Sequence, residues 1–482
     1  MHTVTIEPGM LIAGMVVVIA ILATRLSSRL GVPALLLFLA TGMLAGSDGP
    51  GGIWFDDPAL AWRVGLVALS VLLFSAGLDT DIKSVRPVLG PGLALATVGV
   101  TVSAGLTALF YSLAFDRPAL EGALLGAIVS STDAAAVFGV LRTTGIRLKG
   151  RIQHLLEMES GSNDPVAIYL TVAATAALAG TSPSVATIAL GMLGQMGIGL
   201  VVSVAGGWAL AWAINRLRAG QEGLYPVFAT ALALAIFGGA AVAHGSAFVA
   251  VYVAGIVAGS GPLIHRRGIV RFHDALAWLA QISMFVLLGL LVFPSRLPSV
   301  AGEGLAIAAF LLLVARPLAV FASLAPFRFP LRQQAMVAWV GLRGAVPIVL
   351  ATWPRVAGVE GADRIFDIVF FVVVVSVLVQ GMSLPAVARW LDLAEASPSP
   401  ERDLAEAAGE ARGAHTTRLR VGRRAHGRSL LEVGLPPRAL VALVEHNGQR
   451  IVPQGSTTLR EGDHVLVVFQ DGQEEAVREL LS

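Results

Sequence analysis

The sequence contains no cysteine, and only 14% of its 482 residues are charged. Without cysteine the chain cannot form disulfide bonds, thiolate metal sites or cysteine nucleophiles. Soluble proteins average about 25% charged residues. This chain is instead 55% hydrophobic, with a mean hydropathy of +0.76. The scarcity of charge therefore predicts a polytopic membrane protein.

Several familiar motifs are also missing. The chain has no Walker phosphate-binding loop and no Gly-x-Gly-x-x-Gly sequence, so ATP-driven pumping and nucleotide cofactors are not supported. Its net charge of +2 is too small to indicate nucleic-acid binding. The first ten residues contain Glu7 but no lysine or arginine, so they lack the basic start of a secretory signal. We expect no cofactor, and we expect the first apolar segment to be retained.

Apolar segments long enough to cross a bilayer recur along the first 390 residues, separated by short polar segments. We predict thirteen transmembrane helices, at residues 10–24, 32–46, 62–78, 88–115, 120–141, 153–179, 185–215, 224–243, 246–260, 273–293, 303–325, 333–352 and 365–389.

Basic residues are distributed unequally between the alternate loops of this arrangement. One set of loops holds fifteen: Arg25, Arg29, Lys83, Arg86, Arg142, Arg147, Lys149, Arg151, Arg216, Arg218, Arg266, Arg267, Arg271, Arg328 and Arg332. The other set holds five: Arg63, Arg117, Arg296, Arg355 and Arg364. Because basic loops stay in the cytoplasm, we expect the N-terminus outside and the C-terminus inside.

The composition changes after the last apolar segment. Residues 1–392 form the predicted membrane domain, and residues 393–417 a polar linker with a short helix after Pro400. Residues 418–482 alternate like a small α/β domain, with strands at 418–421, 439–444, 450–453 and 464–469 and helices at 429–433 and 474–481. About 65 residues give only a marginal core, so we expect this domain to pair with another copy. The predicted class is thus an all-α polytopic membrane protein with a small cytoplasmic α/β domain.

Residues 156–171 open the sixth apolar segment yet hold three carboxylates, two serines and an asparagine. A charged side chain at membrane depth costs at least about 2.5–3.5 kcal/mol, so such residues indicate function. Ser160 and Asp164 are four residues apart and share a helix face, with Asn163 beside them. The alternative is that the helix begins only at Val166 and that the acids lie in a solvated loop.

Two further segments contain helix-breaking sequences. Residues 130–134 place four hydrogen-bonding side chains in a row, and Asp133 could cap a following half-helix. A capped helix without an ion role is the alternative. Residues 341–347 place two glycines and a proline around Arg343, which is unfavourable for a continuous helix. If spans 1–6 and 8–13 are repeats around the seventh, these two breaks are equivalent, and such pairs indicate a transporter site.

A buried arginine requires a carboxylate partner. For Arg343 we predict Glu159. Arg316, which precedes Pro317 in the eleventh span, has no assigned partner, and the alternative for it is snorkelling at a helix end. Glu157 has no assigned role.

The three motifs resemble those of monovalent cation/proton antiporters of the sodium/proton exchanger superfamily. The sequence ESGSND at residues 159–164 is similar to that family's acidic signature, STDA at 131–134 to its threonine-aspartate crossover, and GLRGAV at 341–346 to its arginine motif. The tail is similar to the TrkA-C domain, the C-terminal lobe of the domains that regulate potassium conductance. The combination resembles bacterial potassium/proton antiporters of the cell-volume-regulation type.

This resemblance implies a homodimer in the bacterial inner membrane. It implies inverted repeats, two broken crossing helices, and a core of spans 4–6 and 11–13 that moves against a dimerisation scaffold. It also implies an alkali cation at Asp164, structural pairing of Glu159 with Arg343, and further ion-site residues, which are Thr132, Asp133, Ser160 and Asn163. The third span reads Leu-Phe-Ser-Ala-Gly-Leu at residues 73–78, so an accessory acid found in many relatives is missing.

The residues support a simple exchange mechanism. Burial disfavours a bare carboxylate, so a proton and an alkali ion compete for Asp164, and the site crosses the membrane with one or the other. If Asp133 stays ionised as a counter-charge, one proton exchanges for one cation and the cycle is electroneutral.

Other functions remain open from the residues alone. Potassium is favoured over sodium only by the tail, so a sodium/proton antiporter is the first alternative. A ligand-gated cation channel is more distant, because no filter-like carbonyl loop is present. An intramembrane aspartyl protease would need Asp133 and Asp164 as a dyad. The tail could bind a cyclic dinucleotide, another small molecule or nothing.

Overall fold

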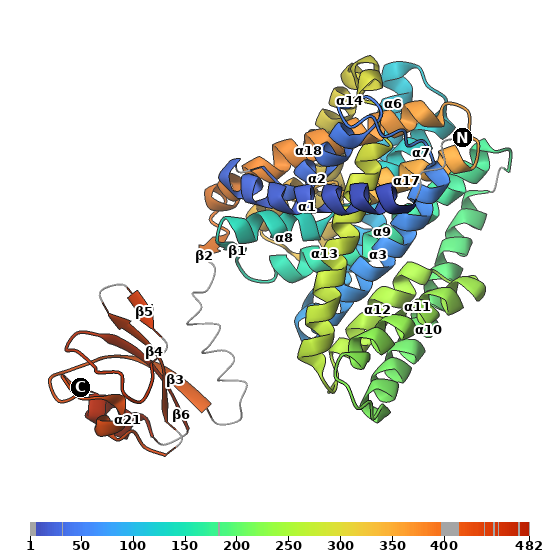
Figure 1. Ribbon diagram of the computed structural model, residues 1–482. Helices are drawn as coiled ribbons and strands as arrows, with labels where there is room; N and C mark the ends of the chain where they lie inside the picture. Colours follow the sequence, from blue (N-terminus) through green and yellow to red (C-terminus); the bar gives the residue numbers. More distant parts are fainter. Residues whose placement is uncertain are drawn as a thin grey trace. The chain divides into compact units, whose positions relative to one another are not determined.

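The computed structural model describes residues 6–30, 32–181, 184–396, 414–437, 439–446, 449–451, 453–470 and 473–481. The chain divides into two compact units, residues 1–395 and 396–482. The first is helical and the second contains a small antiparallel sheet (Figure 1). The helix predicted after Pro400 lies outside the described residues.

Each predicted span coincides with one helix or with helices in series. These are α1 (Ile6–Leu30), α2 (Ala34–Ala45), α3 (Pro58–Asp79), the series α4 (Ile82–Val85), η1 (Arg86–Val88), α5 (Leu89–Ala94), η2 (Leu95–Gly99) and α6 (Val100–Phe115), the pair α7 (Ala119–Val129) and α8 (Ala134–Thr143), α9 (Ile152–Leu178), α10 (Val185–Arg216), α11 (Leu224–Val242), α12 (Ala247–Gly259), α13 (Arg266–Leu290), the series η3 (Pro294–Arg296), α14 (Leu297–Phe310), η4 (Leu311–Ala315), α15 (Arg316–Leu324) and η5 (Ala325–Phe327), the pair α16 (Leu331–Trp339) and α17 (Ala345–Val356), and α18 (Ala362–Trp390).

The predicted class of helical, multi-pass membrane protein is confirmed. Among the described residues, seven helices are long and apolar enough to cross a membrane. An eighth is added if α7 and α8, which are bent by 42°, form one span. Shorter apolar helices lie at Gly14–Arg25, α2, α12 and α17. The count of thirteen crossings therefore stays a prediction.

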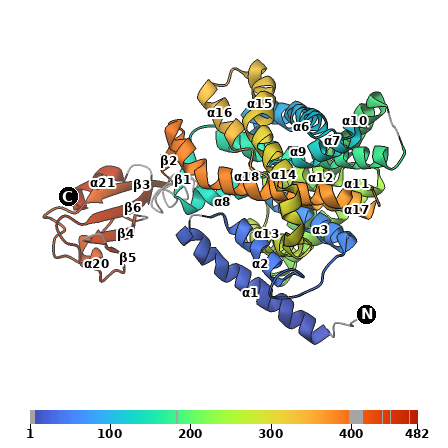
Figure 2. The same cartoon turned by 90° about the horizontal axis from the view of Figure 1, so that it is seen from above.

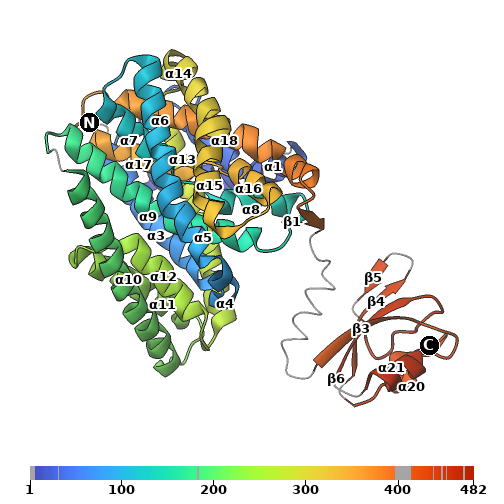
Figure 3. The same cartoon turned by 180° about the vertical axis from the view of Figure 1, so that it is seen from behind.

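The helices form two bundles. In the first, which we call the scaffold bundle, α1–α3 pack with α10–α13. In the second, the core bundle, α4–α9 pack with α14–α18. Figures 1 and 3 show α10, α11 and α12 side by side, and Figure 2 shows α1 along the outside of α2. The bundles meet where α3 contacts α17 and where α12 contacts α9. This division matches the one that the family resemblance implies.

Glycines set the close helix contacts in the scaffold bundle. A Cβ on Gly42 of α2 would collide with the backbone of α13 at Val286, and a Cβ on Gly77 of α3 with the backbone of α12 at Tyr252. Only glycine permits such an approach. In the predicted repeat, span 2 is equivalent to span 9 and span 3 to span 10. The contact of α2 with α13 therefore corresponds to that of α12 with α3, which supports the repeat.

The core bundle shows the same correspondence. The fourth span contains a π-helical turn, η2, and its equivalent, the eleventh, contains another, η4. The sixth and thirteenth spans, α9 and α18, each contain an internal proline, Pro165 and Pro385. Because seven positions separate equivalent spans, each pair would run in opposite directions if every span crosses once.

A short sheet at the end of α18 is absent from the sequence prediction, which starts a linker at residue 393. Strand β1 (Ile146–Leu148) pairs with β2 (Ala394–Ala396). The Lys149 amide donates to the carbonyl of Leu393 at 2.9 Å, and Lys149 Nζ lies 3.0 Å from Asp392 Oδ1. Strands of three residues are too short to produce a readable alternation of apolar and polar residues.

The second unit is the α/β domain expected from the tail sequence. Its sheet has the order β3-β6-β4-β5, with β3 (Ala414–Arg420), β4 (Leu440–His446), β5 (Gln449–Ile451) and β6 (His464–Gln470), and each neighbouring pair is antiparallel. Two helices accompany it, α20 (Leu430–Val433) and α21 (Glu474–Leu481). Its buried core includes Val441, Val467, Phe469 and Val477.

Candidate ion-binding site

The fifth span is interrupted between α7 and α8, at residues 130–133. The residues that follow α7 in this interruption have carbonyl groups without partners inside a helix. Arg343 satisfies two of them, since its Nη1 donates to the carbonyls of Ser130 and Ser131, both at 2.7 Å. At the start of α8, Asp133 Oδ1 accepts a hydrogen bond from the Ala136 amide at 3.0 Å. A guanidinium group thus lies at the C-terminal end of one half-helix and a carboxyl group at the N-terminal end of the next, an arrangement that suits both helix dipoles.

The twelfth span is interrupted between α16 and α17, and this break meets the first one. The Asp133 amide donates to the Leu342 carbonyl at 2.8 Å. A Cβ on Gly344 would collide with the Asp133 side chain. The prediction of two broken helices that meet in the membrane unit is therefore confirmed.

Helix α9 presents a polar stripe to the first break. Asp164 is 6% exposed, and its Oδ1 accepts a hydrogen bond from Ser131 Oγ at 2.5 Å. Ser160 Oγ donates to the Thr132 carbonyl and accepts from the Ala134 amide, both at 3.1 Å. The acidic and polar residues of the segment 156–171 all lie inside α9 (Ile152–Leu178). The alternative, in which the helix begins only at Val166 and the acids lie in a loop, is therefore wrong.

Asn163 completes the stripe. Its Nδ2 donates to Thr132 Oγ1 at 2.6 Å. Its Oδ1 is buried and accepts no hydrogen bond from the described residues. Alkali ions are hard cations that prefer oxygen ligands, and oxygens of Asp164, Asn163, Thr132 and Ser160 are gathered here. The orphaned amide oxygen beside a carboxylate fits such a cation.

The structure corrects the predicted ion pair. Glu159 is 1% exposed, and its Oε1 lies 2.5 Å from Arg316 Nη1. Arg316 is 2% exposed, and its Nη2 also donates to the Val337 carbonyl at 3.3 Å. Glu159 therefore pairs with Arg316, and Arg343 binds backbone carbonyls instead. Snorkelling of Arg316 is excluded by its burial. Both arginines are single cations in apolar spans, so the sequence could not tell which one approaches Glu159.

A polar pair on α18 supports the second break and was missed by the sequence analysis. Ser376 Oγ accepts from the Arg343 amide at 3.0 Å and donates to Gln380 Oε1 at 2.5 Å. Gln380 Nε2 donates to the Trp339 carbonyl at 2.6 Å. The two residues are four positions apart in an apolar span, and this spacing was the available signal. The role of Ser131 as a partner of Asp164 was missed as well, although the residue belongs to the polar run at 130–134.

Glu157 lies outside this network. Its carboxylate accepts from Gln153 Nε2 at 3.0 Å and lies 3.2 Å from His154 Nδ1. The side chain is 30% exposed. Its polar partners are therefore residues of the first turns of α9.

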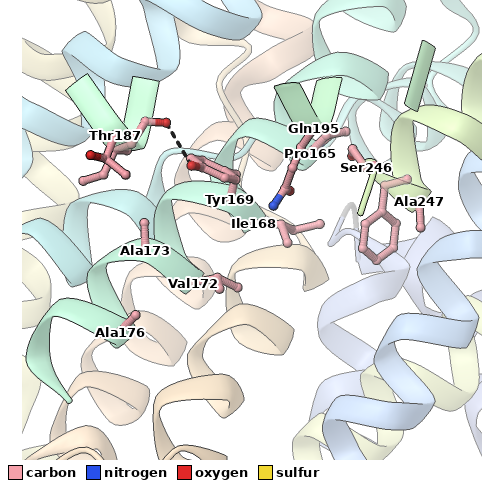
Figure 4. Close-up of a pocket in the computed structure, with 13 residues that line it drawn as sticks. Pro165, Ile168, Tyr169, Val172, Ala173, Ala176, Thr187, Gln195, Ser246 and Ala247 are labelled. Carbon is pink, nitrogen blue, oxygen red and sulfur yellow. Dashed lines mark hydrogen bonds between the residues drawn. The ribbon is translucent and has the colours of Figure 1, made fainter. Parts of the chain in front are cut away.

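A cavity of about 360 Å³ reaches the residue that follows Asp164. It lies between α9 of the core bundle and α10 and the start of α12 of the scaffold bundle, and Pro165 forms part of its wall. Figure 4 shows Tyr169 in this cavity, where its hydroxyl donates to the Ile188 carbonyl at 2.9 Å. Gln195 and Ser246 are further polar lining residues. The cavity provides space beside the ion-site stripe of α9.

Comparison with known proteins gives the class. The transmembrane sodium/hydrogen exchanger family matches residues 15–390, and the TrkA-C domain matches residues 417–482. The first match covers more than half of the chain, so the protein belongs to the sodium/hydrogen exchanger family. It is a cation/proton antiporter, a transporter rather than an enzyme, as the three motifs predicted.

Individual relatives are similar to this chain over most of its length. The K(+)/H(+) antiporter NhaP2 of Shewanella baltica (strain OS223) is 40% identical over 485 residues, which cover 99% of this chain and 84% of the relative. The K(+)/H(+) antiporter NhaP of Alkalimonas amylolytica is 44% identical over 383 residues, which cover 80% of this chain and 67% of the relative. The solved sodium proton antiporter MjNhaP1 of Methanocaldococcus jannaschii at pH 8 has the same fold, with a TM-score of 0.68, 23% identity, and coverage of 78% of this chain and 97% of the other.

Proposed function

We propose that this protein exchanges potassium for protons and that Asp164 carries both ions in turn. The observation that supports the proposal is the surroundings of Asp164, a carboxylate that is 6% exposed beside the orphaned Oδ1 of Asn163. One oxygen of Asp164 is held by Ser131. The nearby oxygens of Thr132 and Ser160 complete a set suited to a desolvated alkali ion.

Exchange follows from competition for one charge. An ionised carboxylate buried without a counter-charge costs several kcal/mol, so the empty, ionised site is unfavourable. Either a proton or a cation removes that cost, but both do not bind together because each neutralises the same group. The loaded states can then move between the two sides of the membrane while the empty, charged state cannot.

The charged residues near Asp164 have structural or balancing roles and do not carry the exchanged ions. Asp133 caps α8 and, when it remains ionised, offsets the positive charge of Arg343 across the two breaks. Glu159 and Arg316 neutralise each other and act structurally. With Asp164 as the one exchanging group, the stoichiometry is one proton per cation, and the cycle is electroneutral.

Potassium is the favoured cation for two reasons. The curated relatives that are 40–44% identical are named K(+)/H(+) antiporters. The chain also carries a TrkA-C domain, of the type that regulates potassium conductance. Sodium is the second candidate, because the Na(+)/H(+) antiporter NhaS2 of Synechocystis is 27% identical over 347 residues. The physiological role would be pH, potassium or volume homeostasis.

The setting we propose is the bacterial inner membrane, with the N-terminus outside and the tail in the cytoplasm. Fifteen basic residues in one set of loops against five in the other support this orientation. We propose a homodimer, from the family resemblance, and regulation by the TrkA-C domain. Its ligand, a cyclic dinucleotide or another small molecule, is left open.

Dye-reported proton flux in proteoliposomes tests the carrier. Asp164→Asn should abolish flux driven by potassium, sodium or lithium pulses, while gel filtration still shows a folded protein. Residual cation-dependent flux would contradict the assignment of Asp164. Comparing potassium with sodium pulses on the unaltered protein decides between the two candidate ions.

Two further measurements test the electroneutral cycle and the role of the tail. An electroneutral cycle predicts that the flux at one fixed potassium gradient is unchanged when the membrane voltage is set at different values with gradients of the permeant anion thiocyanate. A chain that ends at Ala396 keeps β2 and its pairing with β1, so any change in the flux of this variant reports the tail alone.

A further inference from the structure

A second cavity, of about 140 Å³, is lined by Gly341 and Arg343 of the second break, and Asp164 is not among its lining residues. Its walls come from α14, the π-helical turn η4 and α18, and include Leu305, Leu312 and Val375. Its polar lining comes from Arg316, Arg343, Ser376 and Gln380. We call this space the α14–α18 cleft. No step of the exchange mechanism uses it.

Two buried guanidinium groups line the cleft, and both retain hydrogen-bonding capacity. Arg316 Nε and Arg343 Nη2 are buried and have no hydrogen-bond partner among the described residues. The two side chains are 2% and 1% exposed. An unpaired polar N–H group in a protein interior costs about 1–3 kcal/mol, and more when the group is charged. These donors would be stabilised by an acceptor within the cleft.

The charge of the group favours an anion as that acceptor. Glu159 is the carboxylate within ion-pairing distance of Arg316, and among the described residues none lies within that distance of Arg343. Arg343 therefore has no carboxylate in contact, because Asp133, which offsets its charge across the two breaks, lies beyond ion-pairing distance. Ser376 and Gln380 are occupied with each other and with the backbone of the break.

The outer part of the cleft is apolar and open. Leu305, Leu313 and Val379 line it and are 56%, 64% and 43% exposed. In a membrane protein such residues on α14, η4 and α18 face hydrocarbon. A ligand that reaches the two arginines through this opening would pass apolar side chains first, so it needs an apolar body behind its anionic end.

We propose that the α14–α18 cleft binds a long-chain carboxylate from the bilayer. The carboxylate accepts hydrogen bonds from Arg316 and Arg343, and the alkyl chain lies along Leu305, Leu312 and Val375 and leaves between Leu313 and Val379. The volume of the cleft is about 140 Å³, whereas one water molecule in the liquid occupies about 30 Å³. The cleft therefore has room for a carboxylate and several methylene groups.

Photo-labelling of the purified full-length protein in nanodiscs tests this site. The probe is palmitic acid with a diazirine in its chain, and cross-linked peptides are located by mass spectrometry. We expect cross-links within residues 305–313 and 372–380, reduced at least tenfold by excess palmitate. Methyl palmitate, which has the same chain without the charge, should compete far less. Acetate, which has the same head without the chain, should not compete at the same concentration.

Matched variants of α18 provide the structural control. Val379→Trp fills the opening of the cleft, whereas Leu378→Trp adds the same side chain at a neighbouring position that is 38% exposed and does not line the cleft. Labelling of the two segments should fall at least tenfold in the first variant and stay unchanged in the second. Ala309→Phe, which narrows the cleft from α14, replaces Val379→Trp if that variant does not fold.

Three results would overturn the proposal. Equal competition by methyl palmitate would mean ordinary lipid contact, and equal competition by acetate would mean a site for small anions. Undiminished labelling in folded Val379→Trp and Ala309→Phe would place the probe elsewhere. None of these results depends on transport, so the outcome is independent of the proposed antiport.

Discussion

The ion pair of Glu159 with Arg316 gives the sharpest prediction, because the sequence alone favoured Arg343 as the partner. We consider Glu159→Gln, Arg316→Met and Arg343→Met, each alone, and the two double variants that include Glu159→Gln. Glutamine keeps the shape of glutamate and removes its charge, and methionine keeps an apolar stem of similar length without the guanidinium group.

The magnitudes follow from burial and distance. Glu159 and Arg316 are 1% and 2% exposed and 2.5 Å apart, so removing one partner leaves an uncompensated buried charge. Each single substitution should lower the free energy of unfolding by about 3–5 kcal/mol. The double variant of this pair leaves neither charge, so it should be about 2–3 kcal/mol more stable than the sum of the two losses predicts. For Glu159 with Arg343, which are not in contact, this coupling should stay below about 1 kcal/mol.

Unfolding in mixed micelles of mild detergent and SDS, followed by the fluorescence of the eight tryptophans, measures all six proteins. The coupling energy is the quantity to compare, because the single losses also contain packing changes. A larger coupling to Arg343 than to Arg316 would refute the pairing, and with it the separation of a structural pair from the arginine that holds the broken helix.

Three further predictions test the site and the tail. Gly344→Ala should lower exchange at least tenfold, because its Cβ collides with Asp133 and overpacking costs about 1–3 kcal/mol. Ser131→Ala removes the hydrogen bond to Asp164, and the loss of about 1.5 kcal/mol should raise the cation concentration for half-maximal flux about tenfold. In the tail, the Ser429 amide donates to Glu432 and holds the pKa of that carboxyl below its usual value, so its stabilising contribution is complete at neutral pH and is lost as the pH falls through the lowered pKa.

Each of these predictions has a matched control. Gly302→Ala adds a Cβ that meets nothing within 4 Å, so it should leave exchange unchanged. Ser130→Ala removes a hydroxyl that, among the residues that the structure describes, bonds only to the Ala127 carbonyl, so the cation dependence should stay as in the unaltered protein. For the tail, the difference in melting temperature between the unaltered protein and Glu432→Gln should vanish in acid. A persistent difference there, or equal effects of test and control glycines or serines, would contradict the reasoning.

Much of the architecture could be predicted from the sequence because the bilayer imposes strong rules. Apolar length locates helices, and all thirteen predicted segments coincide with helices of the structure. Residues that break a helix can also be recognised in the sequence. The runs at 130–134 and 341–347 lie at the two breaks. Alternation located the tail strands, although β3 begins at Ala414, inside the predicted linker and four residues before the predicted strand. The pairing of β1 with β2 could not be predicted, because three residues carry too little pattern.

The sequence by itself determined which residues are chemically exceptional, namely the carboxylates, serines and arginines placed in apolar spans, since hydrocarbon makes each of them costly without a function. Only the tertiary structure decided their partners. Asp164 is bound by Ser131 from the break in the fifth span, and Glu159 by Arg316 rather than Arg343. Partnership between spans depends on distances of a few ångströms between helix faces, and local sequence does not contain these distances. The sequence therefore predicts which buried charged residues need a partner, and the structure shows which group the partner is.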